Sequence, residues 1–322
     1  MKIAIIGTGY VGLVSGLCFA KIGHEVICVD NNSAKIEQLQ NGQIPIYEPG
    51  LKEILDEAVA AKKITFTTDL AQAVQNSQAV FIAVGTPSLP SLASLPSLTQ
   101  NEETGSADLS FVFNAAKEIS QNINSYKVIV TKSTVPVGTN LQIKKIIENT
   151  NPNAQFSVAS NPEFLREGCA IDDFLKPDRI VVGLEDETCS PEAKKIMAEI
   201  YAHFDGKAPL IFTDIATAEM IKYAANSFLA VKICFINEIA DLCEKVGADV
   251  RKLSQAIGLD SRIGSKFLNP GPGFGGSCFP KDILALENIA TESNVELSLI
   301  SSTINPSASF SLLAMLLIRD NL

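Results

Sequence analysis

The sequence predicts an α/β fold: a doubly wound, mostly parallel Rossmann-like sheet, followed by a long central helix and an all-α domain. Three observations lead to this prediction. Short apolar runs alternate with helical patterns in the first half of the chain, a glycine-rich turn follows the first run, and the longest helical pattern comes after them. Apolar runs that alternate with helices are typical of parallel strands, because helices then cover both faces of the sheet.

The predicted strands are short and mostly apolar throughout, as expected for strands that are buried on both faces. They are residues 3–6, 25–29, 79–84, 127–130, 156–159 and 179–183. The predicted helices have apolar residues at helical spacing. They are residues 12–22, 33–40, 50–61, 111–120, 140–149 and 191–203, with a further helix that starts at Pro280.

A long helical pattern, residues 214–246, contains no Gly or Pro before Gly247. At 1.5 Å per residue it would extend about 45–50 Å, which is longer than one small domain requires. We therefore expect this helix to join two domains or to form the core of a dimer. The expected domains are residues 1–212, with an inserted Ser-Leu-Pro-rich loop near 87–106, and residues 213–322. That loop would be a functional lid or a tolerated insertion.

The composition excludes several classes of protein. Hydrophobic residues make up 46% of the 322 residues, so the chain can form a core and is not disordered. The formal net charge of −10 disfavours nucleic acid and membrane surfaces as partners. Seven cysteines, an odd number without a C-x-x-C pair, favour a reduced, cytoplasmic location. With only two histidines, no metal site is expected.

A glycine-rich turn, Gly7-Thr8-Gly9-Tyr10-Val11-Gly12, links the first predicted strand to the first helix. Gly7 would allow the tight turn, Gly9 would admit a pyrophosphate, and Gly12 would let helix and strand pack closely. Asp30 ends the second strand, where its carboxylate would accept from the ribose hydroxyls and repel a 2′-phosphate. The sequence thus predicts an NAD site. Lys35 would lie at the adenosine end of this site or extend into solvent.

Polar residues follow other predicted strands, at the sheet edge where ligands bind in open α/β folds. Thr86, Ser133 and Thr134 are placed to contact a dinucleotide. Alternatively they serve ordinary turn chemistry, which we favour for Ser133. Further along, Glu163 and Glu167 would form an acidic surface pair or place an acid–base group in the site. Spacing leaves these alternatives open.

Two polar side chains lie on one face of the long helix. Lys222 and Asn226 are four residues apart, and their neighbours are mostly apolar or small. A lysine in such surroundings could transfer protons or stabilise an oxyanion. Equally, its ammonium group could extend to solvent along an apolar surface.

The segment 273–282, Gly-Phe-Gly-Gly-Ser-Cys-Phe-Pro-Lys-Asp, carries the densest signal in the chain. Its three glycines permit a positive φ or the close approach of a ligand. Pro280 suits the first turn of a helix, so Cys278 would lie at the positive helix end, which stabilises a thiolate. Lys281 would add to that field, and Asp282 could accept a proton. Cys278 is therefore predicted to be a nucleophile.

A nicotinamide site combined with a nucleophilic cysteine implies a four-electron oxidation. One hydride transfer turns an alcohol into an aldehyde, and the thiolate traps the aldehyde as a thiohemiacetal. A second hydride transfer gives a thioester, from which water releases a carboxylate.

These motifs resemble those of the nucleotide-sugar dehydrogenases. The likeness extends over nearly the whole chain, through residues 7–12, 47–51, 132–138, 161–168, 222–226 and 273–282. Residues 178–183, Asp-Arg-Ile-Val-Val-Gly, resemble the UDP-glucose 6-dehydrogenases more than the GDP-mannose branch. The resemblance implies NAD as cofactor, UDP-glucose or a similar nucleotide sugar as substrate, and a homodimer formed through the helix 214–246.

The resemblance also implies roles for individual residues. The expected catalytic residues are Cys278 as nucleophile, Lys222 and Asn226 at the oxyanion, Asp282 and Thr134 near the catalytic water, and Glu163 in thioester hydrolysis. The expected cofactor-binding residues are Gly7, Gly9, Tyr10, Val11, Gly12, Asp30, Lys35, Thr86, Thr134, Glu167 and Lys281. The expected substrate-binding residues are Phe164, Leu165, Lys222, Asn226, Arg262, Phe267, Phe274 and Gly275, with Arg262 reaching the substrate of the neighbouring subunit.

The chain departs from the family pattern at the loop near 87–106 and at its end, where family members continue with a second Rossmann-like, UDP-binding domain. We therefore expect NAD binding to be retained and UDP-sugar binding to be weakened. Three alternatives stay open: a dehydrogenase of UDP-N-acetylmannosamine or GDP-mannose, a non-catalytic NAD-binding fragment, and a 3-hydroxy acid dehydrogenase, which would not need Cys278.

Overall fold

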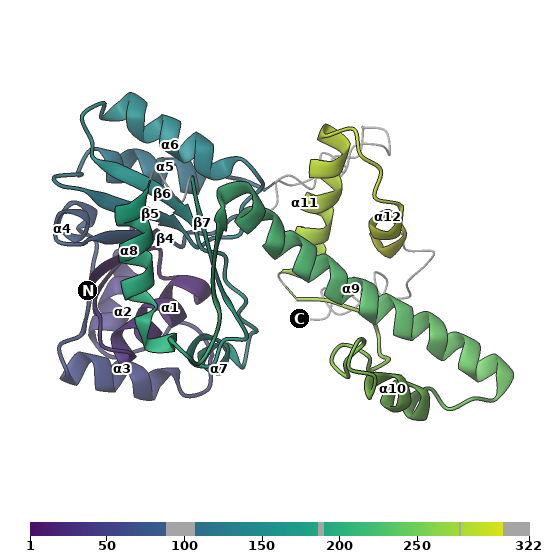
Figure 1. Ribbon diagram of the computed structural model, residues 1–322. Helices are drawn as coiled ribbons and strands as arrows, with labels where there is room; N and C mark the ends of the chain where they lie inside the picture. The colour runs from purple at the N-terminus through teal and green to yellow at the C-terminus, as the bar shows by residue number, and fades with distance from the viewer. Residues whose placement is uncertain (88–106, 186–189, 277, 305–322) are drawn as a thin grey trace, which may run out of the picture. The chain divides into compact units, whose positions relative to one another are not determined.

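The computed structural model describes residues 1–87, 107–185, 190–276 and 278–304 of the chain (Figure 1). The chain forms two compact units, of which the first comprises Met1–Pro87 and Asp108–Lys222. The second unit includes the chain from Tyr223 onward. The loop predicted near 87–106 lies, apart from Pro87, outside the described residues.

The first unit is built on one sheet, which has eight strands in the part of the chain that the structure describes. Their order is β3-β2-β1-β4-β5-β6-β7-β8. The strands are β1 (Lys2–Ile6), β2 (Glu25–Val29), β3 (Ile64–Thr67), β4 (Ala79–Ile82), β5 (Lys127–Thr131), β6 (Phe156–Ser160), β7 (Ile180–Leu184) and β8 (Leu210–Asp214). All neighbours pair in parallel except β6 and β7, which run antiparallel. The order reverses between β1 and β4, which creates the crevice where doubly wound folds bind ligands.

Helices pack against both faces of this sheet, as the apolar strands require. They are α1 (Tyr10–Lys21), α2 (Ser33–Gln40), α3 (Leu51–Ala60), α4 (Leu70–Gln75), α5 (Ser110–Ser120), α6 (Thr139–Thr150), α7 (Ala170–Leu175) and α8 (Pro191–Ile200). In β1, Ile3 and Ile5 join a core with side chains of α1 and α3. The alternate residues Ala4 and Ile6 join a second core with side chains of α5 and α6. The predicted doubly wound fold is confirmed.

Two strands that the sequence analysis did not predict, β3 and β8, lie at the edges of the sheet. In β3, Ile64 and Phe66 are buried while Thr65 is exposed. An edge strand is covered less completely than a central one, so a continuous apolar run is not required there. The prediction therefore found the central strands, and the outer ones were missed.

The antiparallel pair β6 and β7 overlaps only briefly, with Ala159 opposite Leu184 and Ser160 opposite Gly183. Strand β7 therefore begins beyond the carboxyl end of β6, beside the residues that follow it. The side chain of Asn161 bridges this junction, because its Nδ2 donates to the carbonyl oxygen of Val181 at 2.7 Å. Strand β8 pairs in parallel with β7 and leads directly into the long helix α9 (Ile215–Val246).

Helix α9 has 32 residues and matches the predicted long helix. Asp214 starts it, since its carboxylate accepts from the backbone N–H of Thr217 at 2.8 Å and from the Thr217 hydroxyl at 2.6 Å. Gly247, with a φ of +74°, follows its last residue, which is the usual way for a helix to end. No helix of the described residues is long and apolar enough to cross a membrane.

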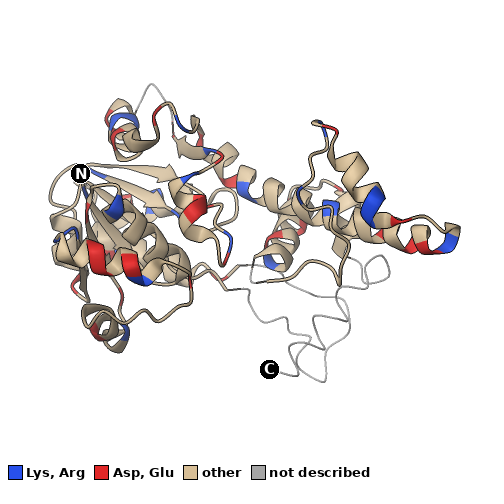
Figure 2. Cartoon of the chain, turned by 90° about the horizontal axis from the view of Figure 1, so that it is seen from below, with Lys and Arg blue, Asp and Glu red and all other residues tan. Residues whose placement is uncertain are grey.

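The second unit contains most of α9 together with α10 (Val250–Gly258), α11 (Phe279–Glu292) and α12 (Ser298–Ile304). Its core forms where Ala230 and Cys234 of α9 meet Phe274 and Ile283. Lys and Arg positions are interspersed with Asp and Glu positions along the backbone of both units (Figure 2). The regular structure in its described residues is helical, which agrees with the predicted all-α domain.

Candidate active site

The glycine turn after β1 has the geometry that the sequence predicts. Gly7 has a φ of +100°, and a Cβ atom there would lie 2.7 Å from the carbonyl oxygen of Ala83. A Cβ atom at Gly12 would lie 2.0 Å from the carbonyl oxygen of Gly7. At Gly9, by contrast, a Cβ atom would meet nothing within 4 Å. The first two positions thus need glycine for packing, and the open space at Gly9 can admit a ligand. Tyr10 and Val11 begin α1 beside this space.

Asp30 lies at the end of β2 and is already oriented by its neighbours. Its carboxylate accepts from the backbone N–H of Thr8 at 2.9 Å, from the Thr8 hydroxyl at 2.7 Å and from the N–H of Asn32 at 3.0 Å. Burial disfavours the charged form, but these hydrogen bonds outweigh burial and lower the pKa of Asp30. Lys35 is not simply solvated, because its Nζ lies 3.0 Å from Asp30 Oδ2. The pair presents an ionised carboxylate at the mouth of the crevice.

A pocket of about 470 Å³ opens at this crevice. Its lining includes Gly7, Gly9, Asp30, Lys35 and Gly85, which follow or end β1, β2 and β4. The donor and acceptor groups fit NAD: a ribose can donate to Asp30, and backbone N–H groups at the start of α1 can hold a pyrophosphate.

The polar residues after β4 and β5 contact one another. The Thr86 hydroxyl donates to the carbonyl oxygen of Thr134 at 3.0 Å. The Ser133 hydroxyl donates to the carbonyl oxygen of Val84 at 2.6 Å. Ser133 thus joins two strand ends, as expected for turn chemistry, while the roles of Thr86 and Thr134 toward a ligand stay predictions.

A buried ion pair joins the segment after β6 to helix α9. Lys222 Nζ lies 2.8 Å from Glu163 Oε1, and the two side chains are only 4% and 5% exposed. The Lys222 ammonium also lies 5.6 Å from the centre of the Phe164 ring, on which Arg179 stacks at 3.8 Å. Lys222 therefore does not extend to solvent, and Glu163 is no surface residue. The sequence left both possibilities open.

Three further residues beside this pair were missed by sequence reasoning. Lys132 is 5% exposed, and its Nζ donates to Asn161 Oδ1 at 3.0 Å. The hydroxyl of Tyr201 donates to the same oxygen. Burial lowers the pKa of Lys132 to about 8, against the attraction of Glu163, which raises it. The feature of the sequence that could have identified Lys132 as a site residue is its position directly after a buried strand.

Helix α9 is fixed to the sheet one turn before Lys222. Glu219 is 2% exposed and accepts from the backbone N–H groups of Gly138 at 2.7 Å and of Asn140 at 3.0 Å. Burial raises the pKa of Glu219, and the bonds from Asn140 and Gly138 oppose this. The carboxylate thereby holds the first turns of α9 against the start of α6.

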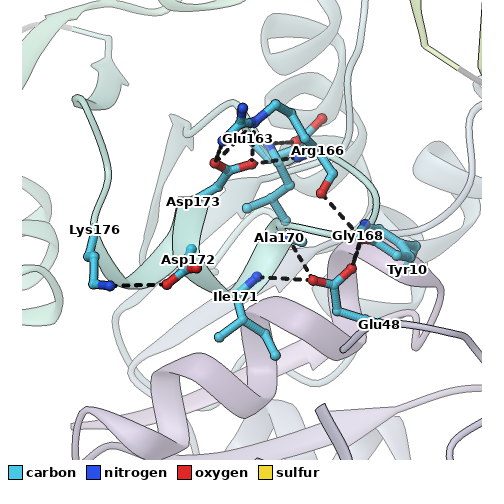
Figure 3. A network of polar contacts seen from close by, with 11 residues as sticks. Tyr10, Glu48, Glu163, Arg166, Gly168, Ala170, Ile171, Asp172, Asp173 and Lys176 are labelled. Carbon is cyan, nitrogen blue, oxygen red and sulfur yellow. Dashed lines mark hydrogen bonds and ion pairs between the residues drawn. The ribbon is translucent and has the colours of Figure 1, made fainter. Parts of the chain in front are cut away.

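A second carboxylate network connects the glycine turn to the segment after β6 (Figure 3). Glu48 is 6% exposed, and its carboxylate accepts from the Tyr10 hydroxyl. It also accepts from the backbone N–H groups of Gly168 and Ala170, both at 2.8 Å. Nearby, Arg166 forms a two-pronged ion pair with Asp173 (Figure 3). Glu167 and Leu165 belong to the same segment, Glu167 exposed and Leu165 half-buried. Glu48 was not among the predicted site residues.

In the second unit, Asn226 and Asp282 form a buried pair, 7% and 0% exposed. Asn226 Nδ2 donates to Asp282 Oδ2 at 2.6 Å, and Lys281 Nζ lies 2.9 Å from Asp282 Oδ1. Cys278 is the N-cap residue of α11, one turn before Asp282. Its position at the helix start is as predicted, and α11 begins at Phe279.

The remaining predicted residues surround this loop. Gly273 and Gly276 have positive φ angles of +116° and +81°, as the glycine-rich composition predicts. Phe274 is buried and both it and Phe267 pack against Phe279, whereas Gly275 is exposed. Arg262 is 87% exposed in its side chain and pairs with Asp260. Its contact with a neighbouring subunit stays a prediction.

The reversed sheet order, the glycine turn and Asp30 define a dinucleotide-binding dehydrogenase fold. The chain belongs to the UDP-glucose/GDP-mannose dehydrogenase family: residues 1–205 match the family's NAD-binding domain, and residues 216–306 match its central domain. NAD is the cofactor of this domain.

Similar proteins include a UDP-glucose 6-dehydrogenase of Rhizobium meliloti (strain 1021). It is 53% identical over 305 residues, which are 94% of this chain and 67% of that protein. A solved structure of a UDP-glucose dehydrogenase from the hyperthermophilic archaeon Pyrobaculum islandicum superimposes with a TM-score of 0.86. It is 40% identical, with 94% of this chain and 67% of that chain covered. A GDP-mannose dehydrogenase of Pseudomonas aeruginosa, solved as a ternary complex, is 36% identical with a TM-score of 0.74. The match covers 94% of this chain and 67% of that chain. The chain spans 62% to 67% of the length of the curated relatives compared first.

Proposed function

We propose that this chain carries the NAD-binding and catalytic parts of a UDP-glucose 6-dehydrogenase, which oxidises UDP-glucose to UDP-glucuronate in a four-electron reaction. One observation carries the proposal. A chain with an NAD crevice also places a cysteine, Cys278, at the start of α11, one turn before the buried Asp282. A dehydrogenase that removes only two electrons has no use for such a nucleophile.

The reaction balances as two hydride transfers and one hydrolysis. NAD, when bound, supplies the hydride acceptor, so two are reduced for each sugar. The primary alcohol of glucose loses one hydride and one proton and becomes an aldehyde. The Cys278 thiolate adds to the aldehyde carbon and forms a thiohemiacetal, whose loss of a second hydride leaves a thioester. Water breaks the carbon–sulfur bond, and the products are a carboxylate and the free thiolate.

The buried polar and charged side chains suit the two remaining catalytic roles, which are stabilising the oxyanion and activating the water. Lys222, held by Glu163, offers its ammonium hydrogens to negative charge that develops on the substrate oxygen. Asn226 is oriented by its bond to Asp282 and acts as a second donor there. Glu163 and Thr134 assist the water that cleaves the thioester. Lys222 and Asn226 are each held by a bond to a buried carboxylate, which lowers the cost of reorganisation during the reaction.

UDP-glucose is favoured over other nucleotide sugars by the relatives. Relatives at 53% and 51% identity carry the name UDP-glucose 6-dehydrogenase, whereas the compared GDP-mannose dehydrogenase is 36% identical. A non-catalytic NAD-binding role is the second candidate, because residues 1–205 by themselves match the family's NAD-binding domain.

The test counts NADH released by the purified chain per UDP-glucose consumed, with GDP-mannose as the control sugar. We expect about two NADH per sugar, the ratio that two hydride transfers require. The variant Cys278→Ser should form no acid, and acid formation at the wild-type rate would refute the covalent mechanism. No NADH from a chain that binds NAD in calorimetry would favour the non-catalytic role.

We also propose that the chain forms a homodimer through α9. Phe228, Phe235 and Leu242 lie seven residues apart on this helix and are 63%, 48% and 56% exposed. A seven-residue apolar repeat places side chains along one helix face, where a second copy can cover them.

A further inference from the structure

The Glu48 carboxylate lies where three segments distant in sequence meet. Tyr10 comes from the glycine turn, Glu48 from the loop before α3, and Gly168 and Ala170 from the segment that follows β6 (Figure 3). The side chain of Glu48 is 6% exposed, so its charge is removed from water. The donors that compensate for this are one hydroxyl and backbone N–H groups, which a carboxylate accepts strongly.

The two carboxylate oxygens of Glu48 accept hydrogen bonds from different donors. Glu48 Oε2 accepts from the Tyr10 hydroxyl and from the N–H of Gly168 at 2.8 Å. Glu48 Oε1 accepts from the N–H of Ala170 at 2.8 Å. The Gly168 N–H also lies 3.2 Å from the Tyr10 oxygen, so hydroxyl, carboxylate and amide form a closed group. Burial and the bond to Glu48 raise the pKa of Tyr10, which therefore stays a hydrogen-bond donor.

This group fixes one end of the segment that carries Glu163. The other end is fixed by Asn161, whose N–H donates to the carbonyl oxygen of Thr131 at 2.9 Å. Between these anchors, Glu163 accepts from the N–H of Leu165 and pairs with Lys222. The position of Glu163 thus depends on an anchor that reaches back to the glycine turn.

At the other end of the link, Tyr10 is the first residue of α1 and follows Gly9, where a pyrophosphate fits. A ligand that fixes the backbone of this turn also fixes the start of the Tyr10 side chain. By thermodynamic reciprocity, if the ligand strengthens the bond at the Tyr10 hydroxyl by some factor, that bond strengthens binding of the ligand by the same factor.

We propose that Glu48 is a positioning residue that fastens the Glu163 segment to the cofactor turn, so that NAD binding and the placement of Glu163 are coupled. The role of Glu163 in this statement rests on the proposed function; the coupling itself does not.

The experiment measures hydrogen–deuterium exchange of the peptide that contains Gly168 and Ala170, with and without saturating NAD, together with the NAD dissociation constant. The main variant is Glu48→Gln, because an amide must turn its NH2 group toward one of the N–H donors that the carboxylate accepts. Glu53→Gln, which neutralises an exposed carboxylate on the next helix, is the matched control.

In the wild-type chain we expect NAD to slow exchange of these amides by about 10-fold, a coupling of the usual size between two sites. In Glu48→Gln this NAD-dependent slowing should disappear and the dissociation constant for NAD should rise by about the same factor. Glu53→Gln should behave like the wild type. If Glu48→Gln exchanges faster but NAD still slows this exchange by the wild-type factor, at an unchanged dissociation constant, Glu48 is merely structural and the proposal is overturned.

Tyr10→Phe keeps the test decisive if Glu48→Gln fails to fold. This variant leaves Glu48 its backbone donors and removes only the hydroxyl, so the NAD-dependent slowing should be lost in a folded chain. Retention of the wild-type slowing would overturn the proposal. These readouts need NAD alone, so a chain that does not oxidise UDP-glucose refutes the proposed function without affecting them. In an active chain, Glu48→Gln should lower kcat and leave the KM for the sugar nearly unchanged.

Discussion

Replacing Lys132 by methionine should stabilise the protein at neutral pH, although it removes a hydrogen bond. Lys132 is buried at 5% exposure, and its nitrogen donates to Asn161 Oδ1 at 3.0 Å. Methionine has nearly the same length and fills the same space without a charge. Asn161 Oδ1 keeps the Tyr201 hydroxyl as a donor, and the Asn161 carbonyl oxygen loses only a long contact of 3.5 Å from Lys132 Nζ.

The size of the effect follows from the pKa of Lys132, which burial lowers from 10.5 to about 8. At pH 7 the folded chain must keep this ammonium charged in a buried place, which costs about 3 kcal/mol at roughly 1.4 kcal/mol per pKa unit. The lost hydrogen bond offsets about 1 kcal/mol. Lys132→Met should therefore raise the free energy of unfolding by about 2 kcal/mol at pH 7.

The pH dependence of the free energy of unfolding tests whether the buried charge of Lys132 is the cause of this difference. A base whose pKa is lowered by folding carries its full penalty below the folded pKa, and the penalty falls as pH rises toward the unfolded pKa. Between pH 7 and 9.5 the wild type should gain about 2 kcal/mol relative to Lys132→Met, because the unfolded chain then binds more protons than the folded one. The ionisable groups that both proteins share contribute equally to the two free energies of unfolding, so their contributions cancel in the difference.

Urea unfolding followed by tyrosine fluorescence is the suitable assay. The chain has no Trp and five Tyr, of which four lie in the first unit with Lys132. Lys117→Met serves as control: it removes an exposed lysine of the same unit, so its stability should stay close to that of the wild type at both pH values. If Lys132→Met is less stable than the wild type at pH 7 and the difference does not change up to pH 9.5, the buried charge is not costly and the reasoning is wrong.

Three other substitutions test the site and the proposed dimer. Asp30→Ala should weaken NAD binding by about 1–3 kcal/mol in calorimetry, since a charged hydrogen-bond acceptor is lost; an unchanged dissociation constant would mean that the ribose is held elsewhere. Gly12→Ala should destabilise the first unit by about 1–3 kcal/mol in urea unfolding, because backbone must move to admit the methyl group; an unchanged stability would contradict the packing role of this glycine. Phe235→Lys should shift sedimentation from dimer to monomer, with Glu244→Lys, exposed on the opposite face of α9, as control; a dimer that persists would rule out this face of α9.

The sequence predicted the parts of the fold in which local pattern and tertiary burial agree. The central strands β1, β2, β4, β5 and β6 are apolar on both faces, and α9 lacks any residue that would end it before Gly247. The short helices α4 and α7 were missed. Each has six residues, too few to show a clear helical period.

For the candidate site, motifs predicted residues but not their charge environment. Sequence spacing could not decide whether Lys222 reaches solvent, because its partner Glu163 lies far away in the chain. Glu48 was missed for the same reason, since Tyr10 and Gly168 approach it from distant segments. Pairings of this kind are set by the topology of the sheet, and local sequence carries no signal for them.

The brief overlap between β6 and β7 has a consequence for local unfolding. These strands share two register pairs, whereas the other neighbouring strands share four or five. The sheet is therefore weakest at this junction, and a partial opening with the lowest free energy would separate β7, β8 and the start of α9 from the rest. Such an opening would part Lys222 from Glu163 before the nucleotide crevice is disturbed. Two bonded groups oppose this opening: Asn161, whose side chain bonds across the junction to Val181, and Glu219, which bonds the first turns of α9 to the start of α6.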